Sequence, residues 1–134
     1  MNGQYFIDVD RGLVVKKHVG QISVDDEIEI LNTIVSDPKF RKGMNAVCDF
    51  TDANVSWELA DLDKFRAFVR RMSNAWGKCR WAIIFPSGKD ASTAKLFVTL
   101  NEAFEESVSA RLFRSMDEAL AWAQAKTASE EPDK

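Results

Sequence analysis

Hydrophobic and polar positions alternate at the start of the chain, with the period of two that indicates a β-strand with one wet face. Tyr5, Ile7 and Val9 occupy the apolar positions, and aspartates stand between and after them. After a short turn, residues 13–19 are rich in valine, which favours an extended backbone. The pattern therefore predicts an N-terminal β-hairpin.

The pattern then changes to a helical period twice. Ser23, followed three positions later by Asp26, resembles a capping box and predicts a helix that ends before Pro38. A short apolar run at residues 46–50 predicts a strand covered on both faces. The second helix has a long apolar stripe and ends at Gly77. Its stripe consists of Leu59, Leu62, Phe65, Val69, Met72 and Trp76.

The last third of the chain repeats this alternation. Residues 80–85 predict a strand, and the spacing of Phe97, Leu100 and Phe104 predicts a helical face. A final strand is expected at residues 110–113. An S-x-x-E capping box at Ser115 then opens a last helix that carries Leu120 and Trp122.

Strands that alternate with helices predict an α/β fold. We expect a single-domain, mixed, largely parallel sheet with an N-terminal hairpin and flanking helices. The chain length of 134 residues fits one domain, which we place at residues 1–126. Residues 127–134 are polar and include a proline, so they are expected to form a flexible C-terminal tail.

Composition narrows the function classes. The chain is 46% hydrophobic and 29% charged, with a net charge of -3, so we expect no nucleic-acid partner. No apolar run approaches the length of roughly 18 residues that spans a bilayer, and we expect no stable membrane insertion and a cytoplasmic location. Cys48 and Cys79 stand outside any CxxC pair, which favours two buried thiols.

The first candidate site is the junction that follows the strand at residues 46–50. Asp49, Thr51 and Asp52 lie near the carboxyl end of that strand, the edge at which open α/β sheets usually bind ligands. Ser56 stands where the next helix begins and could carry a phosphate there. Asx-type turns and a helix N-cap explain the same residues equally well.

The second candidate site is the loop Ser87, Gly88 and Lys89, which follows another strand and precedes a helix. Its amides and ammonium group could hold an anion, although Asp90 stands where a Walker A motif requires serine or threonine. A tight turn with a helix cap is the alternative.

Other chemistry-bearing residues favour structural roles. His18, the single histidine, lies in a predicted strand without an adjacent nucleophile. The acidic run at residues 25–27 lies in a first helical turn, where the helix dipole accounts for it. The tryptophans are expected to pack in and around the core. A basic face on and after the second helix is expected to be solvated, with a partner or acidic-lipid patch as the sharper alternative. That face comprises Lys64, Arg66, Arg70, Arg71, Lys78 and Arg80.

Four phrases of the sequence resemble the STAS-type domains related to the sporulation anti-sigma-factor antagonist, and particularly the SpoIIAA-like group of small bacterial proteins. They are "HVGQISVDDE", "AVCDFTDANVS", "CRWAIIFPS" and "ARLFRSMDEALAWA". The resemblance implies a mixed sheet flanked by helices, and the related Sec14-type lipid-binding domains suggest hydrophobic ligands. Phosphorylated antagonists have an Asp-Ser-Ser-Gly-type motif, whereas Trp57 follows Ser56 here, so the resemblance does not extend to that switch motif.

These observations lead to a ranked set of functions. We expect a non-enzymatic regulatory or ligand-binding module, without cofactor or metal, that binds a small apolar or anionic ligand. An apolar ligand would enter between the second helix and the sheet. The alternative is a homodimeric protein-interaction domain that docks to a signalling or sigma-factor regulator through aromatic residues around the second helix. An enzyme that uses paired carboxylates ranks third.

Overall fold

Five strands form one sheet in the order β1-β2-β3-β4-β5 in the computed structural model, which describes residues 3–125. The hairpin pair β1–β2 is antiparallel, and the three following pairs are parallel. This arrangement confirms the predicted fold class. The predicted tail at residues 127–134 lies outside the described residues. The strands are β1 (Gly3–Asp8), β2 (Leu13–Gln21), β3 (Asn45–Asn54), β4 (Cys79–Ile84) and β5 (Val108–Phe113).

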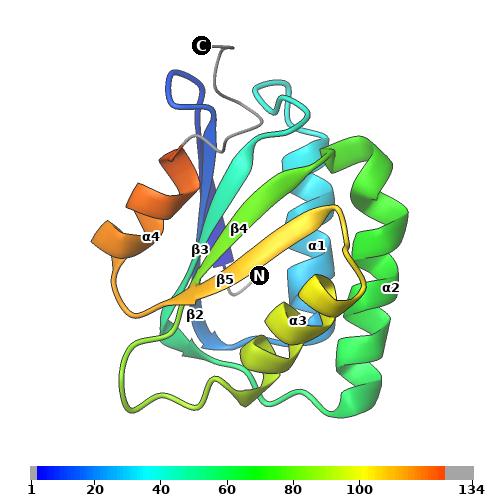
Figure 1. Cartoon of the computed structure of the whole chain (residues 1–134), viewed down its shortest axis with the longest axis vertical. Coiled ribbons are helices and arrows are strands. Elements are labelled where there is room, and N and C mark those ends of the chain that lie inside the picture. Colours follow the sequence, from blue (N-terminus) through cyan, green and yellow to red (C-terminus); the bar gives the residue numbers. More distant parts are fainter. Residues whose placement is uncertain (1–2, 126–134) are drawn as a thin grey trace.

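Four helices cover the sheet unequally (Figure 1). Three of them lie on one face and enclose the larger hydrophobic core, while α4 covers part of the other face and encloses a smaller one. A polar or apolar side chain therefore meets very different surroundings depending on the sheet face to which it points. The helices are α1 (Val24–Val35), α2 (Leu59–Trp76), α3 (Ser92–Ala103) and α4 (Met116–Gln124).

Strand β2 points two polar side chains into the larger core. Val14, Lys16 and His18 share one face of the strand by the alternation of a β-strand, and all three are buried. The other face carries Val15 and Val19, which are partly or largely exposed. The buried face of β2 is therefore amphipathic, and it lies opposite α1.

Strand β3 is longer than the sequence predicted. It continues to Asn54 because its partner β2 extends to Gln21, and the pairing runs to the end of both strands with one irregularity beside His18. Thr51 and Asp52 therefore belong to the strand and not to a loop. The prediction of a strand over residues 46–50 was too short, because polar side chains on an exposed strand end resemble a loop in sequence.

The start of α2 also differs from the expectation. Its N-cap is Glu58, whose backbone N–H donates to Asp61 Oδ2 at 3.0 Å. Ser56 lies two residues earlier and does not cap the helix, and Trp57 lies before the helix instead of beginning it. The predicted stripe is buried apart from Leu59, which is 69% exposed.

The predicted C-terminal half is confirmed in its order and corrected in one detail. Ser115 caps α4 by accepting a hydrogen bond from the backbone N–H of Glu118. Phe104, which the spacing placed on the buried face of a helix, instead lies just beyond α3 and is 59% exposed. Arg66 and Arg70 lie over its ring, so cationic side chains cover part of this aromatic surface.

Candidate functional site: an aromatic cavity with a charged floor

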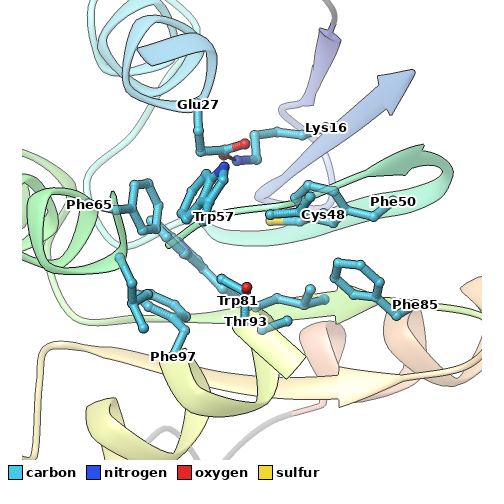
Figure 2. A pocket seen from close by; sticks show the side chains of 14 residues that line it. Lys16, Glu27, Cys48, Phe50, Trp57, Phe65, Trp81, Phe85, Thr93 and Phe97 are labelled. Carbon is cyan, nitrogen blue, oxygen red and sulfur yellow. Dashed lines mark hydrogen bonds and ion pairs between the residues drawn. The ribbon is translucent and has the colours of Figure 1, made fainter. Parts of the chain in front are cut away.

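A cavity of about 50 Å³ lies between α2, α3 and the sheet, and it reaches about 500 Å³ when its mouth to solvent is included. The lining side chains come from β2, β3 and β4, from the segment before α2, from α1, and from the first two turns of α2 and α3 (Figure 2). Its walls are mostly aromatic and aliphatic. They comprise Phe50, Val55, Trp57, Leu62, Phe65, Trp81, Ile83, Phe85, Ala94 and Phe97.

The aromatic walls support one another. Phe50 and Phe85 are stacked with ring centroids 5.0 Å apart. Phe65 contacts Trp57 edge to face at 5.2 Å and lies tilted against Phe97 at 5.4 Å. Such pairs contribute about 0.5–1.5 kcal/mol each beyond the area they bury. These contacts connect β3 to the end of β4, and α2 to α3 and to the segment before α2, so the shape of the cavity depends on several elements at once.

The floor of the cavity is a buried ion pair. Lys16 of β2 and Glu27 of α1 meet through Nζ and Oε1, and both side chains are at most 4% exposed. Figure 2 shows the two side chains converging at one end of the cavity. A charge removed from water to this extent requires a partner. The pair therefore explains why a lysine and a glutamate are tolerated in this core.

His18 lies beside the floor, next to Glu27, although it is not one of the residues that line the cavity. Its Nε2 lies 3.0 Å from Glu27 Oε2. Within the described residues neither atom has a partner in hydrogen-bond alignment, so we describe the pair as a close contact and not as a directed hydrogen bond. The imidazole ring stacks on Phe50 at 4.6 Å. Through Phe50, the histidine connects the charged floor to the aromatic wall.

Burial and charge act in opposite directions on the two ionised groups. Burial favours the neutral form of the Glu27 carboxyl, but the neighbouring Lys16 ammonium and His18 outweigh it and lower its pKa to about 2. Burial likewise disfavours the Lys16 ammonium, yet the Cys48 sulfur and the Glu27 carboxylate leave its pKa above the ordinary value. Both groups are therefore ionised at neutral pH.

Cys48 completes the floor beside Lys16. Burial raises the pKa of its thiol to about 11 although the Lys16 ammonium opposes the shift. The thiol is therefore protonated at neutral pH and a poor nucleophile. Because Lys16 is protonated as well, neither side chain is prepared for covalent catalysis.

The mouth of the cavity is formed by less buried side chains. Trp57 is partly exposed and donates from its indole Nε1 to the backbone carbonyl of Ile22 at 3.0 Å. Thr93, in the first turn of α3, is also partly exposed and brings a hydroxyl group to the lining. Val55 is the third partly exposed lining residue, and the other lining side chains are buried.

The predicted site residues in β3, and Ser56 just after it, already have partners within the protein. Asp49 Oδ1 accepts from the backbone N–H and the hydroxyl of Thr51, which is the Asx-type bonding given as the alternative. Asp52 forms an ion pair with Lys17 at 3.1 Å. Ser56 Oγ accepts from Gln21 Nε2 at 3.1 Å.

The second candidate site, the loop of Ser87, Gly88 and Lys89, follows the carboxyl end of β4. Lys89 Nζ donates to the carbonyl of Ala53 at 2.6 Å and so connects this loop to the end of β3. Arg114 donates to Ser87 Oγ at 3.1 Å, and Gly88 adopts a positive φ of 86° in the turn. Among the lining residues of the described chain, none of the seven predicted site residues occurs. Their role as ligand or switch residues stays a prediction.

The predicted basic face is mostly paired. Lys64 contacts Asp25 at 2.7 Å, and Arg70 contacts Glu106 at 2.7 Å. Arg80 points inward to the end of α4, where it donates to the Trp122 carbonyl at 2.8 Å. Lys64, Arg70, Arg71 and Lys78 are exposed, as expected of a solvated face, whereas Arg80 is buried and does not belong to that face.

The charged floor is the part of the site that the sequence interpretation missed. Glu27 was assigned to the helix dipole, and His18 was considered without Lys16. The sequence nevertheless contains a signal, because Lys16 and His18 occupy the same strand face as Val14. If that face packs against the core, both polar side chains are buried with it. The pairing with α1 requires the tertiary fold.

Comparisons with known proteins support the fold assignment. A search of protein-family models and a search of curated proteins gave no match. Among solved structures, the chain is similar to an uncharacterized protein from the DUF3478 family with a SpoIIAA-like fold, from Shewanella loihica PV-4. The TM-score is 0.59 at 16% sequence identity, and the match covers 91% of this chain and 94% of that chain.

The chain therefore has a SpoIIAA-like fold, as the sequence resemblance implied. Across residues 3–125, no helix combines the length and apolar character that a membrane span requires. The same residues contain no group of three or more metal-ligating side chains placed around a common point.

Proposed function

We propose that this domain is a non-catalytic binding module that holds a compact apolar ligand in the aromatic cavity between α2, α3 and the sheet. The observation that supports the proposal is the cavity itself: an aromatic space at the carboxyl ends of parallel strands, open to solvent on one side. That end of an α/β sheet is the usual place for a ligand. The raised pKa of the Cys48 thiol agrees with binding rather than turnover.

The size of the cavity limits the ligand. A volume of about 50 Å³ inside the cavity is roughly that of a few heavy atoms, given a share of about 30 Å³ per molecule in liquid water. A straight alkyl chain can place its end in this space and leave the remainder in the wider mouth. A rigid, drug-sized ring system would require the walls to move.

Titration with 1-hexanol tests the proposal, with the tryptophan fluorescence of the protein and the NMR signals of its methyl groups as readouts. Trp57 and Trp81 line the cavity, so occupancy should change their emission in a saturable way. Absence of a saturable response to 1-hexanol and to charged chains of the same length would refute the proposal.

Two variants test whether the response to 1-hexanol comes from binding in the cavity. Ala94 lines the cavity and is 9% exposed, so Ala94→Leu fills the space and should weaken binding by about tenfold or more. Ala103, at the exposed end of α3, provides the matched control, because Ala103→Leu adds the same group outside the cavity. Equal weakening by both variants would place the binding elsewhere.

A second candidate function, homodimerisation, is supported by a different observation. Phe6 and Val19 are 62% and 53% exposed, and both lie on the face of β1–β2 that α4 leaves uncovered. The predicted contact through aromatic residues of α2 is less favourable, because Phe65, Phe68 and Trp76 are buried. A signalling or sigma-factor regulator remains an alternative occupant of the same face.

Light scattering at increasing protein concentration separates the two candidates. If the β1–β2 face mediates homodimerisation, Phe6→Ser should shift the protein from dimer to monomer. Leu59→Ser, which changes an equally exposed side chain at the start of α2, should leave the oligomeric state unchanged. A wild-type protein that stays monomeric at high concentration would exclude this second function.

A further inference from the structure

We infer that the cavity selects uncharged ligands, and that the Lys16–Glu27 pair at its floor determines this selectivity. The inference rests on the proposed function, because it names the chemical class of ligand for the same cavity. It also decides between the apolar and the anionic ligands that the sequence left open. The selectivity depends on which charges at the floor are still available to a ligand.

The Lys16 ammonium is already surrounded by groups of the protein. Its Nζ contacts Glu27 Oε1, interacts with the Cys48 sulfur and lies 5.7 Å from the centroid of the Trp81 ring. The ammonium is buried and already has Glu27 as its counter-charge. An incoming carboxylate or phosphate would have to displace Glu27 to obtain a hydrogen bond from Lys16.

An anion therefore meets an unfavourable environment. Lys16 is the single cationic side chain among the lining residues of the described chain, and Glu27 already neutralises it. The remaining walls are mainly aromatic and aliphatic. Transfer of an ionised group from water to such walls without a counter-charge is strongly unfavourable.

A cationic ligand is also disfavoured, because Lys16 would repel it. One Glu27 oxygen contacts Lys16, and the other lies 3.0 Å from His18 Nε2. A ligand ammonium group at the floor would approach Lys16 as closely as it approaches Glu27, so attraction and repulsion oppose each other. The aromatic rings offer cation–π contacts, but Lys16 already occupies the one over Trp81.

A neutral chain avoids both costs. Its methylene groups can contact the rings of Phe65, Phe85 and Phe97, and its end group brings no ionic charge that would need a counter-charge in the cavity. The floor matches such a ligand because Lys16 and Glu27 neutralise each other.

Three probes of equal chain length and different charge test the inference: 1-hexanol, hexanoate and hexylammonium. Binding of each to the full chain is measured at pH 7 by the fluorescence and NMR titrations used for 1-hexanol. We expect 1-hexanol to bind at least about tenfold more tightly than either ion. Equal or tighter binding of hexanoate or hexylammonium would overturn the inference.

Variants of the ion pair test whether Lys16 and Glu27 determine the selectivity. Glu27→Gln leaves the ammonium without its counter-charge and should make hexanoate the preferred probe. Lys16→Met leaves the carboxylate and should favour hexylammonium. The double variant Lys16→Met/Glu27→Gln restores a neutral floor and should again prefer 1-hexanol. Folded single variants that retain the wild-type preference would overturn the assignment to this pair.

The outcomes separate the two proposals. If none of the three probes binds wild-type protein, both the proposed function and the charge selectivity fail. If a charged probe binds best and Ala94→Leu abolishes that binding, the cavity is a ligand site and the inferred selectivity is wrong. Circular dichroism confirms that each variant is folded, and the wild-type comparison decides the charge preference if a single variant fails to fold.

Discussion

At the scale of the residue, the molecule buries charge in a place where apolar side chains would pack more simply. Lys16, Glu27 and His18 are each at most 3% exposed. Replacement of a buried pair by apolar side chains of similar volume is often neutral or stabilising, so stability gives no strong reason for the pair. A role in controlling what enters the cavity supplies such a reason and agrees with the inferred selectivity.

The reactivity of the cysteines is a residue-scale prediction. Burial raises the pKa of the Cys48 thiol to about 11 and that of Cys79 to about 12, from an ordinary value near 9. We expect both thiols of the folded protein to react with a disulfide reagent at pH 8 at least about a hundredfold more slowly than in the unfolded chain. Cys48→Ser and Cys79→Ser assign the two rates.

The same measurement can contradict the structure. A rapid reaction of Cys48 in folded Cys79→Ser protein would show that the floor of the cavity is open to a polar reagent. The reaction in denaturant provides the reference rate for each thiol. Slow reaction of both would agree with a cavity that excludes polar molecules.

Part of the site was predictable from individual residues, and part was not. The alternation of β2 places Lys16 and His18 beside Val14, so their burial follows from the sequence once that face is assigned to the core. The identity of their partner does not follow, because Glu27 belongs to another element and shares a first helical turn with the exposed Asp25 and the partly exposed Asp26. A cavity leaves no local pattern in the sequence, since its lining side chains come from six elements: β2, α1, β3, α2, β4 and α3.

At the scale of the element, α4 depends on a side chain from the sheet. Arg80 of β4 donates to the carbonyls of Trp122 and Ala125 at the end of this helix, and its guanidinium lies 5.5 Å from the centroid of the Trp122 ring. The last carbonyls of a helix have no partner within it, and a cation at that end also favours the helix dipole.

We predict that Arg80→Met destabilises the protein by about 2 kcal/mol and loosens α4 in particular. Hydrogen–deuterium exchange measured by mass spectrometry should show faster exchange in the peptide that contains α4. Arg111→Met is the matched control, because Arg111 lies 5.9 Å from the same Trp122 ring but is exposed. Equal effects of the two variants would indicate that ring contact, and not capping, holds the helix.

Element types were more predictable than element ends. The stripe of α2 apart from Leu59, and the helix end at Gly77, were correct, because a long apolar period and a glycine with a φ of 87° leave little freedom. The ends of β3 and α3 were wrong where polar or aromatic residues continue past the regular pattern. In β3 the pairing with β2 extended the strand, and near Phe104 contacts with arginine side chains replaced burial.

At the scale of the whole molecule, alternation of strands and helices was sufficient to predict the fold class. Parallel neighbours joined by helices restrict the topology strongly, and the similarity to a SpoIIAA-like structure over 91% of the chain agrees with that prediction. Function does not follow in the same way, because one fold serves many sites. For this chain the distinguishing features are the aromatic cavity and its charged floor.

The ion pair also predicts how the stability of the whole molecule depends on pH. The pKa of Glu27 is lowered from 4.5 to about 2 in the folded protein, so its ionised form favours folding above pH 4.5. This contribution is lost as the pH falls toward 2. Urea unfolding at pH 7 and pH 3 measures the change, alongside the same measurements on Glu27→Gln.

The variant isolates the contribution of Glu27 from that of the other carboxyl groups. At pH 7, Glu27→Gln should be less stable than wild type by about 3–5 kcal/mol, because Lys16 is left buried without its counter-charge. At pH 3 the difference should narrow by about 2 kcal/mol, since protonation of Glu27 in the unfolded wild-type chain removes much of its advantage. An equal difference at both pH values would mean that Glu27 does not hold its depressed pKa, and that the floor of the cavity is not an ion pair.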